Sequence, residues 1–389
     1  MTTETETTTP SAAQVPRCPM SESAAAEPIR RVATPTGDPA WQVCGYHLVK
    51  DLFTDARLGR AHPTPATAPR SSYSVFFGSP LGNFETEPED NARMRQLLNP
   101  FFSPRRMREL RPRVEKFTSR LLDDMAAAGG PADLHAALAV PLPLLVITEL
   151  IGVPYSDREM VREWTAALFD KYDAAKSAQA GAEWFAYSKS LVEQQRRTPG
   201  GTGVLPSLCE VEGLSDDVIA TLTLSLLLAG HETSVVEIGL GALALLQNPE
   251  QWELLVSRPE LVPDTVDELL RLHKSTGFAR YARTDFEVEG VPIAKGELLL
   301  LDVDSANHDP TVFTDPRSLN ITRGEAQHLG FGYGPRYCLG APLARVELEV
   351  VFEQLIARFP NLHLAVDPAE LNFRTDVATN GVTELPVAW

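Results

Sequence analysis

One short segment near the C-terminus combines residue types that could hold a metal or a flat cofactor. Residues 330–340 read GFGYGPRYCLG, in which glycines let the backbone turn sharply or approach a flat group. Cys338 directly precedes an apolar helical pattern, and a thiolate at a helix N-terminus is favoured by the helix dipole. A buried cysteine is otherwise more often an inert small apolar residue. A nucleotide loop is disfavoured because no Lys-Ser/Thr pair follows.

A second segment places polar residues inside the longest apolar helix that the sequence predicts, from the N-cap Ser215 to about Gln247. Residues 229–234 read AGHETS, and a glycine inside a helix costs about 1 kcal/mol relative to alanine. Two interpretations stay open: Thr233 bonds back to its own helical turn, or Glu232 and Thr233 manage protons in a groove. An HExxH zinc site is excluded because position 235 is valine.

A third feature is the pair Glu268 and Arg271, which is spaced to lie on one face of a helix. Taken alone, this spacing is as typical of an ordinary surface ion pair.

These segments, in this order, resemble the cytochrome P450 family, soluble bacterial type. The cysteine pattern is met by Phe331, Gly332, Gly334, Arg336, Cys338 and Gly340, and the helix pattern by Ala229, Gly230, Glu232 and Thr233. The resemblance covers residues 28–389. It implies a mainly α cytochrome P450 fold, a helical bundle around haem with small β-sheets.

The resemblance also implies a role for each matching residue in holding haem b. Cys338 would ligate the iron, the one metal ligand expected from the protein, with Phe331, Gly332 and Gly340 shaping its loop. The haem propionates would be held by Arg95, Arg280 and Arg336. One departure concerns the helix before Arg95, where Asn91 replaces the family's usual histidine and cannot carry charge.

On the oxygen-binding side, the resemblance assigns catalysis to the segment of the long helix. Gly230 and Ala229 would leave room for O2, while Thr233 and Glu232 would deliver protons to it. Glu268, Arg271 and Arg323 would form a buried ion network behind the cysteine loop.

The implied function is a haem-thiolate monooxygenase that hydroxylates or epoxidises a small apolar or aromatic secondary metabolite. Oxidative C–C or C–N coupling of an aromatic substrate, such as a cyclic dipeptide, is the alternative, and a haem sensor or carrier is the non-enzymatic one. Electrons would come from NAD(P)H through a separate ferredoxin reductase and ferredoxin. Arg93 to Arg113 hold seven arginines and one acid, a local charge of +6 where an acidic ferredoxin could dock. The substrate pocket would include Phe76, Phe77, Leu226 and Phe278.

Length and composition set the frame for these assignments. The chain has 389 residues and a net charge of −17, which disfavours nucleic acid and anionic membranes as partners. Its four scattered cysteines suit a reducing cytoplasm rather than a disulfide framework. No secretory signal or membrane span is predicted, and we expect a monomer. Residues 1–27 are expected to form a disordered tail, and 28–389 one domain.

Periodicity places the other elements. Helices are predicted at 93–98, 107–125, 157–169, 183–195 and 263–272, and strands at 286–288, 297–301, 371–374 and 383–387, the last two as a pair.

Overall fold

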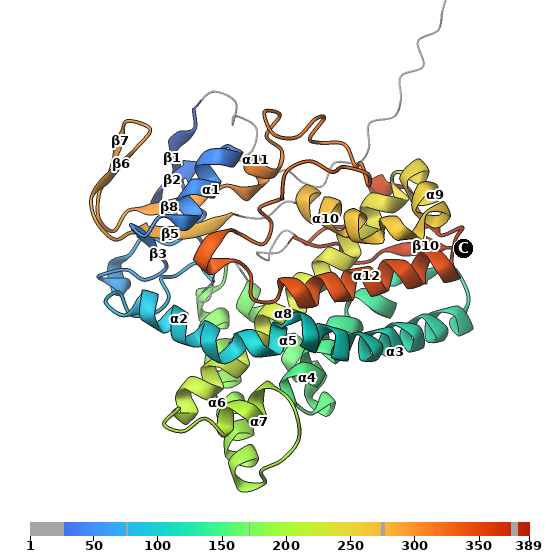
Figure 1. Cartoon of the computed structure of the whole chain (residues 1–389), viewed down its shortest axis with the longest axis horizontal. Helices are drawn as coiled ribbons and strands as arrows, with labels where there is room; N and C mark the ends of the chain where they lie inside the picture. Colours follow the sequence, from blue (N-terminus) through green and yellow to red (C-terminus); the bar gives the residue numbers. More distant parts are fainter. Residues whose placement is uncertain (1–26, 75–76, 171, 274–276, 375–379) are drawn as a thin grey trace, which may run out of the picture.

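The computed structural model describes residues 27–389 except 75–76, 171, 274–276 and 375–379. The predicted tail therefore lies almost wholly outside the described residues. The molecule has a small sheet region on one side and a larger helical region on the other (Figure 1). The mainly α fold predicted from the sequence is confirmed.

The helical region is built around α8, which runs through its middle (Figure 1). The α-helices are α1 (Tyr46–Thr54), α2 (Glu87–Leu98), α3 (Pro104–Ala128), α4 (Pro141–Ile151), α5 (Arg158–Phe169), α6 (Ala174–Arg197), α7 (Val204–Cys209), α8 (Asp216–Leu246), α9 (Pro249–Ser257), α10 (Val262–Leu272), α11 (Val303–Asn307) and α12 (Ala341–Arg358).

All six helices predicted by periodicity are present, because their apolar stripes pack inward. Ser215 caps α8 by accepting a hydrogen bond from the Val218 N–H at 3.4 Å. The sequence analysis missed α4. Its first residue is Pro141, a position where a missing N–H costs nothing, so the proline starts the helix rather than interrupting it.

The strands form three small sheets, and the first has the order β1-β2-β8-β5-β3. Strands β2 and β8 are parallel, and the other pairs of that sheet are antiparallel. A second sheet has the order β4-β10-β9, and β6 pairs with β7. The strands are β1 (Ile29–Ala33), β2 (Pro39–Val43), β3 (Leu58–Gly59), β4 (Ala132–Asp133), β5 (Phe278–Ala282), β6 (Phe286–Val288), β7 (Val291–Ile293), β8 (Leu298–Leu301), β9 (His363–Leu364) and β10 (Pro386–Ala388).

The predicted pair of C-terminal strands is confirmed in part. An antiparallel bridge from Phe373 to Val382 joins the two segments within the described residues, and the Thr383 N–H donates to the Asn372 carbonyl at 3.0 Å. The end of the second segment forms β10, which pairs with β4 and β9. Periodicity identifies an extended segment but not its partner, because pairing is decided by distant parts of the chain.

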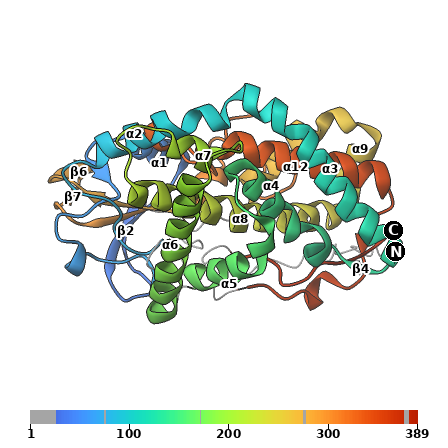
Figure 2. The same ribbon diagram turned by 90° about the horizontal axis from the view of Figure 1, so that it is seen from below.

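Among the described residues, α8 is the one helix long and apolar enough to cross a membrane. However, 67% of its most apolar 18-residue window is buried inside the protein. Helices α4, α6, α10 and α12 pack against it, and Figures 1 and 2 show it in the middle of the helical region. Its composition is therefore explained by its place in the core.

Candidate functional site

The cysteine segment forms a tight loop that ends at the N-terminus of α12. The Cys338 N–H donates to the Phe331 carbonyl at 2.8 Å, and the Tyr337 N–H donates to the Gly334 carbonyl at 3.0 Å. Gly332 and Gly334 adopt φ of 69° and 70°, a conformation that residues with a Cβ rarely adopt. The glycines are thus required by the turn itself.

The Cys338 thiol is accessible, although protein atoms surround it closely. Burial raises the pKa of this thiol. The backbone N–H groups of Gly340 and Ala341, together with the charges of Arg95 and Arg345, act in the opposite direction. A thiolate here would therefore be stabilised by the helix N-terminus and by the two arginine charges. A bound metal ion would further offset the cost of burying the negative charge on sulfur.

Two of the predicted propionate arginines lie close together near the N-terminus of α2. The Arg336 guanidinium pairs with Glu87 at 2.6 Å, a partner that the sequence analysis did not predict. Arg280 is 6% exposed and donates to the Ala279 carbonyl at 2.8 Å. Burial, with the nearby charges of Arg60 and Arg336, lowers the pKa of Arg280 to about 9. The sequence analysis missed Arg60 and Glu87 because neither belongs to a motif.

The third predicted propionate arginine, Arg95, donates to the Tyr337 carbonyl beside the cysteine. Its Nε atom is buried and has no hydrogen-bond partner among the described residues. Asn91 is half-buried one turn earlier on α2, and no hydrogen bond of its side chain is found within the described part of the chain.

On α8, the residues predicted for catalysis face different neighbours. Ala229 and Thr233, four residues apart, are exposed in an otherwise buried stretch and so share one accessible face. The Thr233 hydroxyl donates to the Ala229 carbonyl at 2.7 Å, as the first interpretation of this segment proposed. A Cβ on Gly230 would lie 2.6 Å from Cδ1 of Ile147, so this glycine permits close packing against α4.

Glu232 is 4% exposed and is paired with Arg374 at 2.6 Å. Arg374 follows the Phe373–Val382 bridge, so the C-terminal segment supplies the charge that a buried acid needs. His231 beside it is 1% exposed, and burial lowers the pKa of its imidazole, which indicates a neutral core histidine.

The ExxR pair is buried, not a surface pair. Arg271 donates from Nε to Oε2 of Glu268 at 2.7 Å, and Arg323 donates to Oε1 of Glu268 at 3.0 Å. Arg271 also donates to the Asn307 carbonyl at 2.8 Å. The Asn307 side chain in turn accepts from the Leu329 N–H, two residues before Phe331. The three predicted residues therefore meet, and hydrogen bonds connect them to the start of the cysteine loop.

Of the four residues predicted for the substrate pocket, three are described, and two of these pack against other aromatic rings. Phe76 lies outside the described residues. Phe77 packs on Phe169 with ring centroids 4.4 Å apart, and Phe278 packs on Phe53 at 5.3 Å. Leu226 is 9% exposed on α8.

The charge of +6 counted along 93–113 does not describe the charge of that face. Arg105 and Arg106 pair with Glu109, and Arg113 pairs with Glu149. Arg111 binds three acids, two of them on α12: Glu115, Glu349 and Glu353. Within the described chain, Arg93 and Arg108 have no ion-pair partner. The sequence count missed acids that lie close only after folding.

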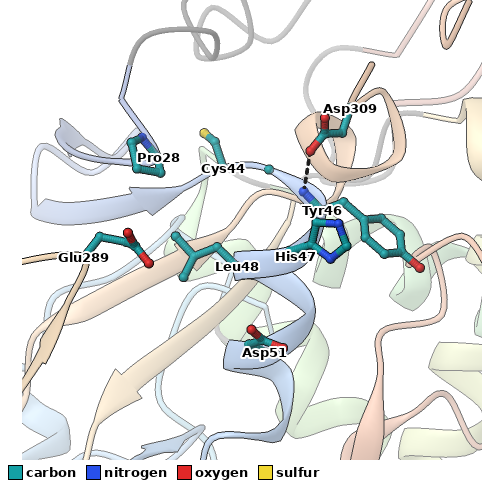
Figure 3. A pocket seen from close by; sticks show the side chains of 9 residues that line it. Pro28, Cys44, Tyr46, His47, Leu48, Asp51, Glu289 and Asp309 are labelled. Carbon is teal, nitrogen blue, oxygen red and sulfur yellow. Dashed lines mark hydrogen bonds between the residues drawn. The ribbon is translucent and has the colours of Figure 1, made fainter. Parts of the chain in front are cut away.

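Elsewhere, a surface pocket lies at the N-terminal end of α1, between Cys44 and Asp309 (Figure 3). The Tyr46 N–H donates to Asp309 there at 2.9 Å, and burial together with Asp302 raises the pKa of Cys44 to about 11. None of its lining residues is a predicted site residue. No group of three or more His, Cys, Asp or Glu side chains suited to a metal occurs in the described residues.

Comparison with known proteins agrees with this geometry. The family model for cytochrome P450 matches residues 204–378. Pentalenolactone synthase of Streptomyces exfoliatus is 38% identical over 371 residues, with 93% of each chain covered. Mycinamicin IV hydroxylase/epoxidase of Micromonospora griseorubida is 36% identical, also with 93% coverage of each chain. A solved structure described as a putative thioether synthase in griseoviridin tailoring has a TM-score of 0.87, at 33% identity and 94% coverage of each chain.

The chain belongs to the cytochrome P450 family. It is an oxidoreductase of the monooxygenase type, and its cofactor is haem. The residues fit this group. An accessible thiol lies at a helix N-terminus, and the guanidinium groups of Arg280 and Arg336 lie near one carboxylate, Glu87, which leaves positive charge for the anionic propionates of haem.

Proposed function

We propose that the protein tailors a small secondary metabolite by hydroxylation or epoxidation as a haem-thiolate monooxygenase within one domain. The observation that carries the proposal is the accessible Cys338 thiol at the N-terminus of α12. The similar mycinamicin enzyme, which is named a hydroxylase/epoxidase, supports this reaction type.

When bound, haem supplies activation of O2 and transfer of one oxygen atom to the substrate. The Cys338 thiolate is its ligand, and the N–H groups of Gly340 and Ala341 hold the negative charge on sulfur. Phe331 packs against Tyr337 next to the thiolate and fixes the loop. Arg95, Arg280 and Arg336 would bind the propionates, with Arg336 placed between a propionate and Glu87.

On α8, Thr233 holds a proton at its Oγ1 atom. Because its hydroxyl donates to the Ala229 carbonyl, the lone pairs of Oγ1 remain free to accept a hydrogen bond and so to orient a proton donor. Glu232 passes protons to this group only after it leaves Arg374, since the guanidinium occupies the carboxylate oxygen Oε1 at 2.6 Å. Gly230 allows α8 to lie close to α4, which fixes where Thr233 stands.

The optical spectrum of the reduced CO complex tests this proposal. Thiolate ligation shifts the main band strongly to the red, and Cys338→Ser is expected to abolish the shift. Substrate-induced spin changes across candidate metabolites then identify the substrate class. A parent protein whose reduced CO complex lacks the red-shifted band would contradict the proposal.

Electrons are proposed to arrive from a ferredoxin and its NAD(P)H-dependent reductase in the cytoplasm, on a monomeric enzyme. Most arginines of 93–113 are already paired with acids of this chain. Electrostatic steering of a ferredoxin therefore rests on the few arginines without an acidic partner among the described residues, among them Arg93 and Arg108. Turnover should therefore fall only modestly as ionic strength rises from low salt. A rate that does not respond to salt would refute docking by charge at this face.

Oxidative C–C or C–N coupling is the second candidate. The similar structure described as a putative thioether synthase supports this candidate, because a thioether synthase joins carbon to sulfur and so forms a new bond. Product mass separates the two candidates, because insertion adds one oxygen atom and coupling removes two hydrogens.

A further inference from the structure

Several arginines gather around one carboxylate at the N-terminus of α2. Oε1 of Glu87 accepts from the Arg60 backbone N–H at 2.6 Å and from the Arg336 guanidinium at 2.6 Å. Oε2 accepts from Arg283 at 3.1 Å. Glu87 is 5% exposed, and this buried carboxylate joins the turn after β3, the residue after β5 and the cysteine loop in one cluster.

The positive charges of this cluster exceed its negative ones. The Arg60 guanidinium has no hydrogen bond or ion pair with any described residue. Arg280 is 6% exposed and binds a backbone carbonyl but no carboxylate. Burial and the charge of Arg336 lower the pKa of Arg60, just as burial and the charges of Arg60 and Arg336 lower that of Arg280. Glu87 is one carboxylate among four guanidinium groups, so the cluster keeps an excess of positive charge that a bound anion would neutralise.

Arg60 resembles Cys338 in two respects, its solvent exposure and the desolvation of its charged group. Both are exposed, yet desolvation is the largest influence on the pKa of each. Each side chain is thus accessible although many protein atoms lie around it. Arg57, three residues earlier, instead binds Asp55 at the surface at 2.6 Å.

We propose that Arg60 binds a haem propionate and supplies the positive charge that Asn91 does not. This inference rests on the proposed haem-thiolate function. Asn91 cannot be charged, whereas the Arg60 guanidinium can bind a carboxylate through two parallel N–H groups. The backbone of Arg60 is held in place by Glu87, so little ordering is needed when the carboxylate binds.

The experiment measures haem release from the purified haem-bound protein to excess apomyoglobin, together with the midpoint potential of the iron. Arg60→Gln is expected to release haem about tenfold faster, because a charge-assisted hydrogen bond is lost. The potential should also fall, since a nearby positive charge disfavours the ferric state. Arg60→Lys should stay close to the parent, and Arg57→Gln is the matched control for removing a neighbouring arginine.

A double variant tests the relation to position 91. Adding Asn91→His to Arg60→Gln should slow haem release again, because an imidazole returns to the usual place. If Arg60→Gln matches Arg57→Gln in both release rate and potential, while its reduced CO complex keeps the red-shifted band, the inference is wrong and the proposed function stands. If Arg60→Gln fails to take up haem while Arg60→Lys does, the inference is supported. A parent protein without the red-shifted band would overturn the proposed function itself.

Discussion

A buried acid on α12 gives the sharpest test of the energetics of this structure. Glu347 is 1% exposed, and its Oε2 accepts a hydrogen bond from the Ser234 hydroxyl of α8 at 2.7 Å. Its other oxygen is buried without a partner among the described residues. Burial raises the pKa of this carboxyl from 4.5 to about 8, so it is protonated in the folded protein at neutral pH.

The sign of the pH dependence follows from that direction. Between pH 4.5 and about 8, the folded state keeps a proton that the unfolded state has lost, so stability falls as pH rises. Each pH unit in this window costs about 1.4 kcal/mol. Relative to pH values below 4.5, Glu347 therefore costs about 3 kcal/mol of unfolding free energy at pH 7.

Glu347→Gln removes this dependence, because an amide does not ionise and still offers an oxygen to Ser234. The measurement is urea unfolding of parent and variant, both with haem, from pH 6 to pH 8. The stability of the variant minus that of the parent should rise by about 2 kcal/mol across this range. The amide nitrogen has no partner, which adds an offset of about 1–3 kcal/mol that does not vary with pH.

The control is Glu353→Gln, on the same helix but with a side chain 40% exposed and paired with Arg111. Its pH dependence should follow that of the parent. If the difference between Glu347→Gln and the parent is flat from pH 6 to pH 8, Glu347 ionises near its ordinary pKa and the reasoning from burial fails.

Three further predictions concern the site. Glu268→Gln leaves Arg271 and Arg323 buried without their carboxylate. It should lower the free energy of unfolding in urea by about 3–5 kcal/mol. A decrease below about 1 kcal/mol would mean that the network is dispensable. Thr233→Ala should keep the red-shifted CO band but divert NAD(P)H consumption away from product, and unchanged coupling would argue against its role in proton delivery. Gly230→Ala should destabilise the protein by about 1–3 kcal/mol, and Ile147→Val should lessen the penalty; strictly additive effects would show that the two residues do not meet.

The sequence predicts the helices of this fold better than its sheets. An apolar stripe repeats within a few residues, so α3, α8 and α10 can be recognised locally. Strand β2 was missed because it pairs with the distant strand β8, and β1, which pairs with β2, was missed with it. The segments at 371–374 and 383–387 were expected to pair, and a short bridge joins them, but the partners of β10 in β4 and β9 were not expected. The first sheet joins residues as distant as Val43 and Leu301, which no local pattern indicates.

The site shows the same division between motif and surroundings. Cys338, Glu268 and Thr233 were recognised because residue type and spacing are set by chemistry and backbone geometry. Glu87, which pairs with Arg336, and Arg374, which pairs with Glu232, were not, since a lone charged residue in a sequence does not show what it will meet after folding. For the same reason, the charge of 93–113 was overestimated.

The polar segment of α8 shows why a local departure from helical rules need not have a single cause. Gly230 meets α4, Glu232 meets Arg374 and Ser234 meets α12, so three of its unusual residues have structural partners. Thr233 bonds back to its own turn, yet remains exposed with Ala229 in a helix that is otherwise buried here. The two interpretations of the segment are therefore compatible. The bond to Ala229 uses the hydroxyl proton and leaves the lone pairs of Oγ1 free, which is the state that a hydrogen-bond acceptor at this position requires.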